Sequence, residues 1–115
     1  MSRHDKVQET LKREISIILQ SELKDPRLGF VTITNVEMAK DLRFAKIFYS
    51  VLGQDTDHQK TKQALDSSLG YIRKLIAERV QLRFTPEIVF KEDRSSEYSF
   101  QIQKVLDEIK KSDTA

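Results

Sequence analysis

The chain contains no cysteine, and only 2 prolines and 3 glycines stand among its 115 residues. The absence of cysteine excludes disulfides, thiolate metal sites and cysteine nucleophiles, and it suits a reducing compartment. So few glycines and prolines argue against a disordered or loop-rich chain. No apolar run approaches the roughly 20 residues that span a bilayer, and the first ten residues hold no apolar signal region. We therefore expect a soluble cytoplasmic protein with a single domain over residues 1–115, ordered from about residue 3 to residue 110.

The net charge is only +2, from 20 lysines and arginines against 18 aspartates and glutamates, yet the positive charge is uneven along the chain. Residues 60–83 carry six basic and two acidic side chains, a net charge of +4, whereas residues 53–59 and 84–115 each carry a net charge of −2. An anion-binding face requires such a basic segment, but ordinary solvated helices carry similar charge. Charge alone leaves both interpretations open.

Two segments near the ends of the chain show apolar side chains at spacings of three and four residues, which predicts amphipathic helices. The first covers residues 3–23 and should end before Pro26, because a residue that precedes proline is disfavoured in the helical region. The second is marked by an apolar stripe that runs from Tyr98 to Ile109.

A third helical stripe begins at Lys60, after a predicted turn over residues 53–59, and continues to about Leu82. Gly70 interrupts this stripe, shortly after Ser67 and Ser68, and serine favours the start of a helix. We expect a kinked pair, with one helix that ends near Ser67 and a second that begins near Gly70. A single bent helix is the alternative, because the stripe keeps its phase.

Three segments show the β-branched, alternating pattern of strands: residues 30–38, 44–52 and 87–92. The alternation changes phase within the first of them, so we expect a β-bulge near Asn35. The first two strands are close enough in sequence to pair as an antiparallel hairpin. The predicted order is helix, strand, strand, helix, kink, helix, strand, helix, which is an α+β fold.

Signatures of catalysis are absent from the sequence, which has no phosphate-binding loop, no dinucleotide-binding turn and no zinc-protease motif. His4 and His58 fall in a predicted N-terminal arm and a predicted loop. Asp55, Asp57 and His58 could be drawn as a metal site, but a short polar turn of this kind is more often simply solvated. We therefore expect a protein that is not an enzyme and has no metal and no cofactor.

The order of elements, with a basic kinked helix pair, matches the type II KH fold of RNA-binding domains with one helix appended. KH domains carry a G-x-x-G loop between the two helices, and this loop clamps the nucleic-acid backbone. Here the corresponding position holds Ser68, Leu69 and Gly70. The fold alone is therefore a weak argument for RNA binding.

A more specific resemblance rests on four blocks: KDPRLGFVTITNVEMAKDL (24–42), FYSVLG (48–53), ALDSSLGYIRKLIAERVQLRFTPEIVF (64–90) and EDRSSEYSFQI (92–102). In order and spacing they resemble the bacterial ribosome-binding factor A family over about residues 3–110. The resemblance implies a KH-like domain in which an Ala-x-Gly kink replaces the G-x-x-G loop. It also implies a ribosome assembly factor that binds free small (30S) subunits and assists late 16S rRNA maturation, including 5′-end processing, and growth in the cold. Ser68 stands where the family usually has the kink alanine, while Gly70 is retained, so we expect the kink to persist.

Such a factor would gain affinity from lysines and arginines that neutralise phosphates and release counterions. Gly70 would let the backbone approach RNA closely, and a helix N-terminus near Ser68 is itself an anion site. An ordinary solvated charge is the alternative for each basic side chain. The predicted RNA-binding residues are Arg27, Ser68, Gly70, Arg73, Lys74, Arg79, Arg83, Lys24, Lys46, Arg3 and Lys6.

The apolar residues are assigned mainly to the core. Ile15, Leu19, Ile72 and Ile76 should be buried against the sheet, and Tyr71 either packs on the sheet or flanks the RNA face. The phenylalanines are expected in the core rather than as platforms for bases: Phe30, Phe44, Phe48, Phe84, Phe90 and Phe100.

The expected partner is the small ribosomal subunit, through its 16S rRNA and its proteins. We expect the protein to act as a monomer that binds no membrane and no small-molecule substrate. The alternative is a general KH-type RNA-binding domain or a protein–protein adaptor without ribosome specificity. Nuclease treatment would release an RNA-bound protein but not an adaptor that uses an apolar patch. A small hydrolase would need a titratable cluster, which the sequence does not offer.

Overall fold

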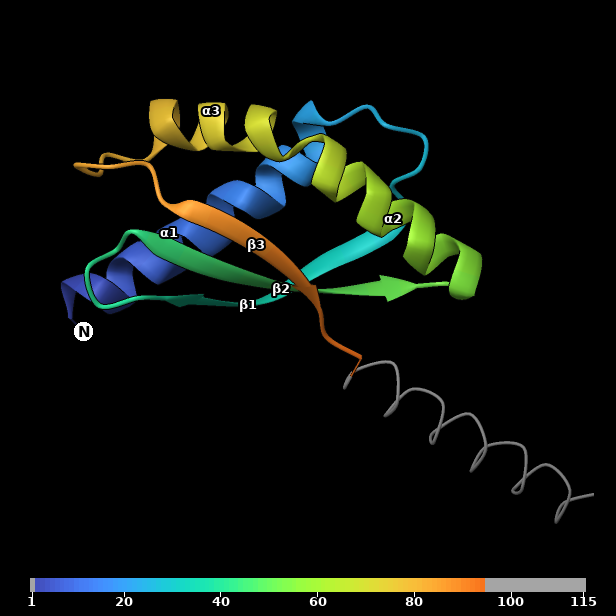
Figure 1. Ribbon diagram of the computed structural model, residues 1–115, viewed down its shortest axis with the longest axis horizontal. Coiled ribbons are helices and arrows are strands. Elements are labelled where there is room, and N and C mark those ends of the chain that lie inside the picture. Colours follow the sequence, from blue (N-terminus) through green and yellow to red (C-terminus); the bar gives the residue numbers. More distant parts are fainter. Residues whose placement is uncertain (1, 95–115) are drawn as a thin grey trace, which may run out of the picture.

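The computed structural model describes residues 2–94, which combine helices with a three-stranded sheet (Figure 1). Within this part of the chain, no helix has the length and hydropathy needed to cross a membrane. The predicted helix from Tyr98 to Ile109, and Phe100 within it, lie outside the described residues. The elements are α1 (Arg3–Ile17), the π-helical turn η1 (Ile18–Glu22), β1 (Phe30–Met38), β2 (Phe44–Leu52), α2 (Asp55–Ser67), α3 (Leu69–Arg79) and β3 (Glu87–Glu92).

The three predicted strands are confirmed with their predicted bounds, and they form one sheet in the order β1-β2-β3. β2 is the central strand, antiparallel to β1 and parallel to β3. The predicted bulge is also confirmed, because the register of β1 shifts between Ile33 and Asn35. This extra residue moves the buried positions of β1 from Ile33 to Val36 and Met38, and so keeps apolar side chains on the inner face.

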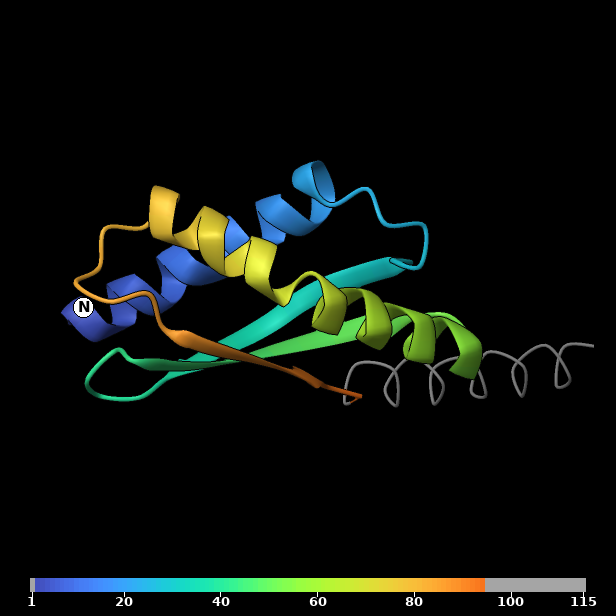
Figure 2. The ribbon, with the colours of Figure 1, turned by 45° about the horizontal axis from the view of Figure 1, so that its top comes forward.

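The helices lie together on one face of the sheet (Figures 1 and 2). Their apolar stripes pack onto the inner face of the strands and form a single hydrophobic cluster. Ile15, Leu19, Ile72 and Ile76 are all buried in it, as the spacing predicted. Alternate residues of β2 point away from the core, towards the opposite face of the sheet. No helix of residues 2–94 covers that face.

The first helix covers the predicted segment but changes geometry in its last turns. It begins with a capping box, in which the Ser2 hydroxyl accepts the Asp5 N–H at 3.1 Å and the Asp5 carboxylate faces the Ser2 N–H. It ends in the wider π-helical turn, where the Leu23 N–H donates to the Ile18 carbonyl at 3.1 Å.

The predicted break between the second and third helices is confirmed. α2 ends at Ser67, α3 begins at Leu69, and Ser68 between them has φ −94° and ψ 1°, outside the helical region. The alternative of one continuous bent helix is therefore excluded. The predicted turn over residues 53–59 is wrong in its second half, because α2 already begins at Asp55.

An N-terminal capping interaction explains why α2 begins at Asp55. The Gln54 N–H donates to the Asp57 carboxylate at 2.8 Å, and the acidic residues lie at the positive end of the helix dipole. A first turn composed of polar residues shows no apolar periodicity, and the sequence therefore resembled a loop there.

Candidate nucleic-acid interface

The break between α2 and α3 leaves backbone open to the outside. Ser68 is the N-cap residue of α3, and its side chain makes no capping hydrogen bond, so the first N–H groups of α3 are not taken up by this hydroxyl. Gly70 is exposed, and a Cβ added to it would meet no atom within 4 Å. The fold itself does not require a glycine here. The open space instead suits the close approach of a ligand to the backbone.

Two exposed side chains of α3 lie beside this open backbone. Tyr71 is 44% exposed, which settles its position at the surface rather than against the sheet. Lys74 follows Gly70 by four residues and Tyr71 by three, so it lies on the same side of α3. We call Ser68, Gly70, Tyr71 and Lys74 the kink surface. It joins amide groups, a cation and an aromatic ring.

Arg73 lies next to Lys74 but is directed into the fold. Its Nε donates to the Pro86 carbonyl at 3.2 Å, and its Nη2 donates to the Thr85 carbonyl at 3.4 Å and lies 3.5 Å from the Glu87 carboxylate. The side chain thus fastens α3 to the segment that leads into β3. The Arg73 guanidinium therefore makes contacts within the fold.

Arg79 and Arg27 also have partners within the fold. Arg79 Nη2 donates to Glu22 at 2.7 Å, which ties the end of α3 to η1. Arg27, in the connection between α1 and β1, donates from Nη2 to Asp25 at 2.7 Å. Hydrogen bonds from the Arg27 side chain, followed by the one from its backbone N–H, lower the pKa of Asp25. The side-chain hydrogen bond to Asp25 raises the pKa of Arg27. A carboxylate therefore partly compensates the positive charge of each of these two arginines.

The other predicted cations are spread over separate surfaces. Lys24 is exposed in the connection between α1 and β1, and Arg3 and Lys6 are exposed on the first turns of α1. Lys46 lies on the open face of the sheet, with its Nζ 5.9 Å from the centre of the Phe48 ring. Arg83 lies beyond the end of α3. The structure thus brings together Ser68, Gly70 and Lys74, and it places Arg83 with Arg3 elsewhere.

Arg3 and Arg83 both line a cavity of about 280 Å³ at the end of the molecule. The connection between β1 and β2, the start of α1 and the connection between α3 and β3 all contribute to it. The sequence assigned no role to Arg43 and placed Phe84 in the core, so it did not predict these two residues as candidates for a site. We call this cavity the end pocket; it is lined by Arg3, Asp41, Leu42, Arg43, Leu82, Arg83 and Phe84.

The assignment of the phenylalanines to the core is wrong for three of them. Phe30, Phe44 and Phe84 are 81%, 41% and 47% exposed. Phe30 and Phe44 fall on the outward phase of their strands, and Phe84 lies in a connection. Phe48 also occupies an outward position of β2 and is half-buried, whereas Phe90 packs against the core, with its ring centre 6.3 Å from that of Tyr49.

The histidines do not lie in an arm and a loop, as the sequence had suggested. His4 is part of α1, with its Nε2 2.9 Å from the Met38 carbonyl oxygen. His58 is buried in α2 beside Glu92 of β3, because α2 starts earlier than predicted. Asp57 caps this helix. Over residues 2–94, no three acidic or histidine side chains gather where they could hold a metal ion.

Comparison with known proteins identifies the family. The family model described as ribosome-binding factor A matches residues 3–106. This chain belongs to the ribosome-binding factor A family. The ribosome-binding factor A of Halothermothrix orenii is 47% identical over 105 residues, which cover 91% of this chain and 86% of that protein. That of Natranaerobius thermophilus is 49% identical over 104 residues, which cover 90% and 79%.

Solved structures of ribosome-binding factor A share the fold. The crystal structure from Thermus thermophilus gives a TM-score of 0.71 at 24% identity, over 80% of this chain and 97% of that one. A homology model of Thermus thermophilus ribosome-binding factor A, fitted into the electron cryo-microscopy map of a 30S complex, gives a TM-score of 0.65 at 26% identity, over 76% of this chain and 92% of that one. The predicted α+β, KH-like class of fold is thus confirmed.

Proposed function

We propose that this protein binds free small ribosomal subunits and assists the late maturation of 16S rRNA, including processing of its 5′ end, in a way that supports growth in the cold. Membership of the ribosome-binding factor A family supports this proposal, as does the relative that was fitted into a 30S complex. In this role the protein acts by binding RNA, without a cofactor or a chemical step of its own.

The kink surface is the observation that carries the proposal. The open backbone at Gly70 admits a phosphate to the first N–H groups of α3, where the helix dipole favours an anion. Lys74 then neutralises a neighbouring phosphate, and the exposed ring of Tyr71 offers a face to a base. These contacts hold an RNA backbone without reading its sequence.

Arg73 and Arg79 serve this surface indirectly. They fix α3 to the β3 connection and to η1, so that the kink surface keeps its shape when RNA binds. In this proposal their role is positioning. Among the predicted cations, Arg27, Arg73 and Arg79 have a carboxylate partner within residues 2–94, whereas Lys74 has none there and is available for a phosphate.

The test is co-sedimentation of the Lys74→Glu variant with purified small subunits at several salt concentrations. Loss of one phosphate contact should weaken binding and flatten the slope of log affinity against log salt by about one unit. The matched control is Lys12→Glu, an exposed lysine on α1. Equal losses from both variants would show that net charge, and not the kink surface, drives binding.

The open face of the sheet favours one other candidate, a protein–protein adaptor. Phe44 and Val89 are 41% and 44% exposed there, on adjacent strands. An adaptor that used these residues would stay with its partner after nuclease digestion of the RNA, whereas the proposed factor would be released. Phe44→Ser would weaken an adaptor and leave the salt dependence of an RNA-binding factor unchanged.

A further inference from the structure

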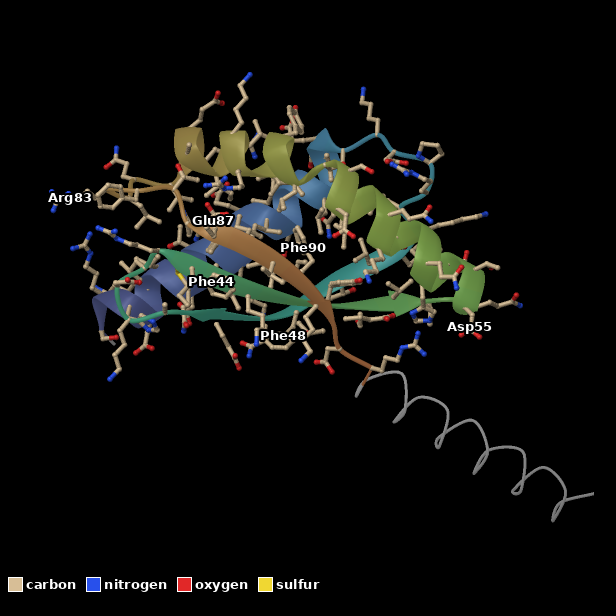
Figure 3. The ribbon with its side chains drawn as sticks, in the orientation of Figure 1. Phe44, Phe48, Asp55, Arg83, Glu87 and Phe90 are labelled. Atoms are coloured by element: carbon tan, nitrogen blue, oxygen red, sulfur yellow. The ribbon has the colours of Figure 1, made fainter. Side chains whose placement is uncertain are left out.

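The end pocket lies away from the kink surface. Figure 3 shows Arg83 at one end of the molecule, where the chain turns back from α3 towards β3. The break between α2 and α3 lies at the other end of α3 (Figure 1). A ligand in the end pocket would therefore use contacts that the kink surface does not supply.

The charges of the pocket favour an anion. Arg3, Arg43 and Arg83 are all exposed around it, against the single carboxylate of Asp41. Among residues 2–94, none of these three guanidinium groups takes part in an ion pair, in contrast to Arg73 and Arg79. Three uncompensated guanidinium groups around one cavity are suited to phosphate, which they bind through several donors.

The aromatic ring of Phe84 adds a second requirement. Phe84 is 47% exposed, with the Arg43 guanidinium carbon 4.4 Å from the ring centre and that of Arg83 at 5.4 Å. An exposed ring beside guanidinium planes is the arrangement on which nucleic-acid bases stack without reading of the sequence. An anion site alone would have no use for this ring.

The pocket is held in place from two sides. The Glu87 N–H donates to the Arg43 carbonyl at 2.9 Å, and Arg73 binds the carbonyls of Thr85 and Pro86. Leu42 has a φ of 62°, a left-handed conformation that is uncommon for leucine and that turns the chain sharply before Arg43. The backbone on both sides of the pocket is thus fixed before a ligand enters.

We propose that the end pocket binds one unstacked nucleotide of single-stranded RNA, with its base on Phe84 and its phosphates among Arg3, Arg43 and Arg83. The Arg83 guanidinium, the more distant of the two, moves aside for the base. The volume of about 280 Å³ lies below the range of pockets for drug-sized molecules, which suits a single base. This inference rests on the proposed function, and it names an additional RNA contact.

The test compares two probes by fluorescence anisotropy: a short oligouridylate, whose bases stack weakly on one another, and a strand of the same length without bases. The full-length protein should bind the oligouridylate on the order of tenfold more tightly than the abasic strand. Phe84→Ala should remove most of this difference, and Phe84→Tyr, which keeps the ring, should preserve it. Arg83→Gln should weaken both strands alike.

Phe30→Ala is the matched control, since Phe30 is an exposed ring at the opposite end of the β1–β2 ladder. Thermal unfolding of each variant checks that the fold persists. Equal binding of the two strands by the unchanged protein, or a full preference in Phe84→Ala, would overturn the inference. If Lys74→Glu still weakens subunit binding in that case, the proposed function stands without the pocket. If the oligouridylate preference depends on Phe84 but the protein ignores small subunits, only the proposed function fails.

Discussion

At position 70, folding and RNA binding favour different residues. It lies in the first turn of α3, where glycine costs backbone entropy, yet a Cβ at this position would meet no neighbouring atom. Folding alone would therefore favour alanine. A close approach of RNA to the backbone would favour glycine.

We predict that Gly70→Ala raises the free energy of unfolding by up to about 1 kcal/mol and weakens binding to small subunits. Urea denaturation and co-sedimentation measure the two effects. Ala77→Gly, at an exposed position of the same helix, is the reverse control and should lower stability with no effect on binding. Unchanged binding by Gly70→Ala would mean that RNA does not approach this backbone.

Tyr49 makes stability depend on pH at the alkaline end. Its burial, followed by the negative charges of Glu92 and Asp66, raises the pKa of its hydroxyl above the usual value of 10.0. The unfolded chain therefore loses this proton at a lower pH than the folded protein does. The stabilisation is complete below pH 10 and is lost as the pH rises from there through the higher folded pKa.

The prediction is that Tyr49→Phe removes this part of the alkaline loss of stability. Urea titrations of both proteins between pH 8 and about pH 11.5 give the free energy of unfolding at each pH. Below about pH 10 this free energy should change with pH in the same way in both proteins. Above about pH 10, the free energy of unfolding of the unchanged protein should fall more steeply than that of the variant. Identical slopes in this range would contradict the assignment.

At the scale of elements, α3 is fixed by its apolar stripe and by polar contacts at two points. Ile72 and Ile76 are fully buried against the sheet, and Arg73 and Arg79 bind segments on either side. The stripe supplies most of the stabilisation, since partly exposed ion pairs contribute little. The arginines instead determine where the helix lies.

Truncation of the stripe should therefore be costly. We expect Ile76→Ala to lower the free energy of unfolding by about 2–5 kcal/mol, because it removes buried methylene groups and leaves a cavity. Chemical denaturation measures the loss. A change below about 0.5 kcal/mol would contradict the packing of α3 on the sheet.

The sequence determines the elements of this fold more fully than its surfaces. The strands, the bulge after Ile33 and the break at Ser68 all follow from alternation and spacing, which depend on neighbouring residues. The start of α2 does not, because Asp57 caps a polar turn that shows no periodicity. The partners of Arg73 and the exposure of Phe84 depend on which connections meet in space, so no local pattern could reveal them.

At the scale of the whole molecule, α3 separates two candidate contacts with RNA. The kink surface is at its N-terminal end, and the end pocket follows its C-terminal end (Figure 1). Each offers a cation without an ion-pair partner in the described part of the chain, Lys74 in one and Arg83 in the other. An RNA that reached both would be held at two separate points.

Two separate contacts should contribute independently. We predict that losses of binding free energy from Lys74→Glu and Arg83→Gln add in the double variant, to within about 0.5 kcal/mol. The salt slope should fall by about two units in total. Subunit binding at several concentrations of potassium chloride measures both. A double variant no weaker than Lys74→Glu alone would show that the pocket contributes nothing on the ribosome.

The parallel pairing of β3 with β2 sets an order of events during synthesis. β1 and β2 can form a hairpin as soon as Leu52 has left the ribosome, but β3 pairs with β2 only after both intervening helices have emerged. Until then β2, which becomes the central strand, has one unpaired edge that can pair with a strand of another chain. Conditions that slow the emergence of Ile88 should therefore increase misassembly.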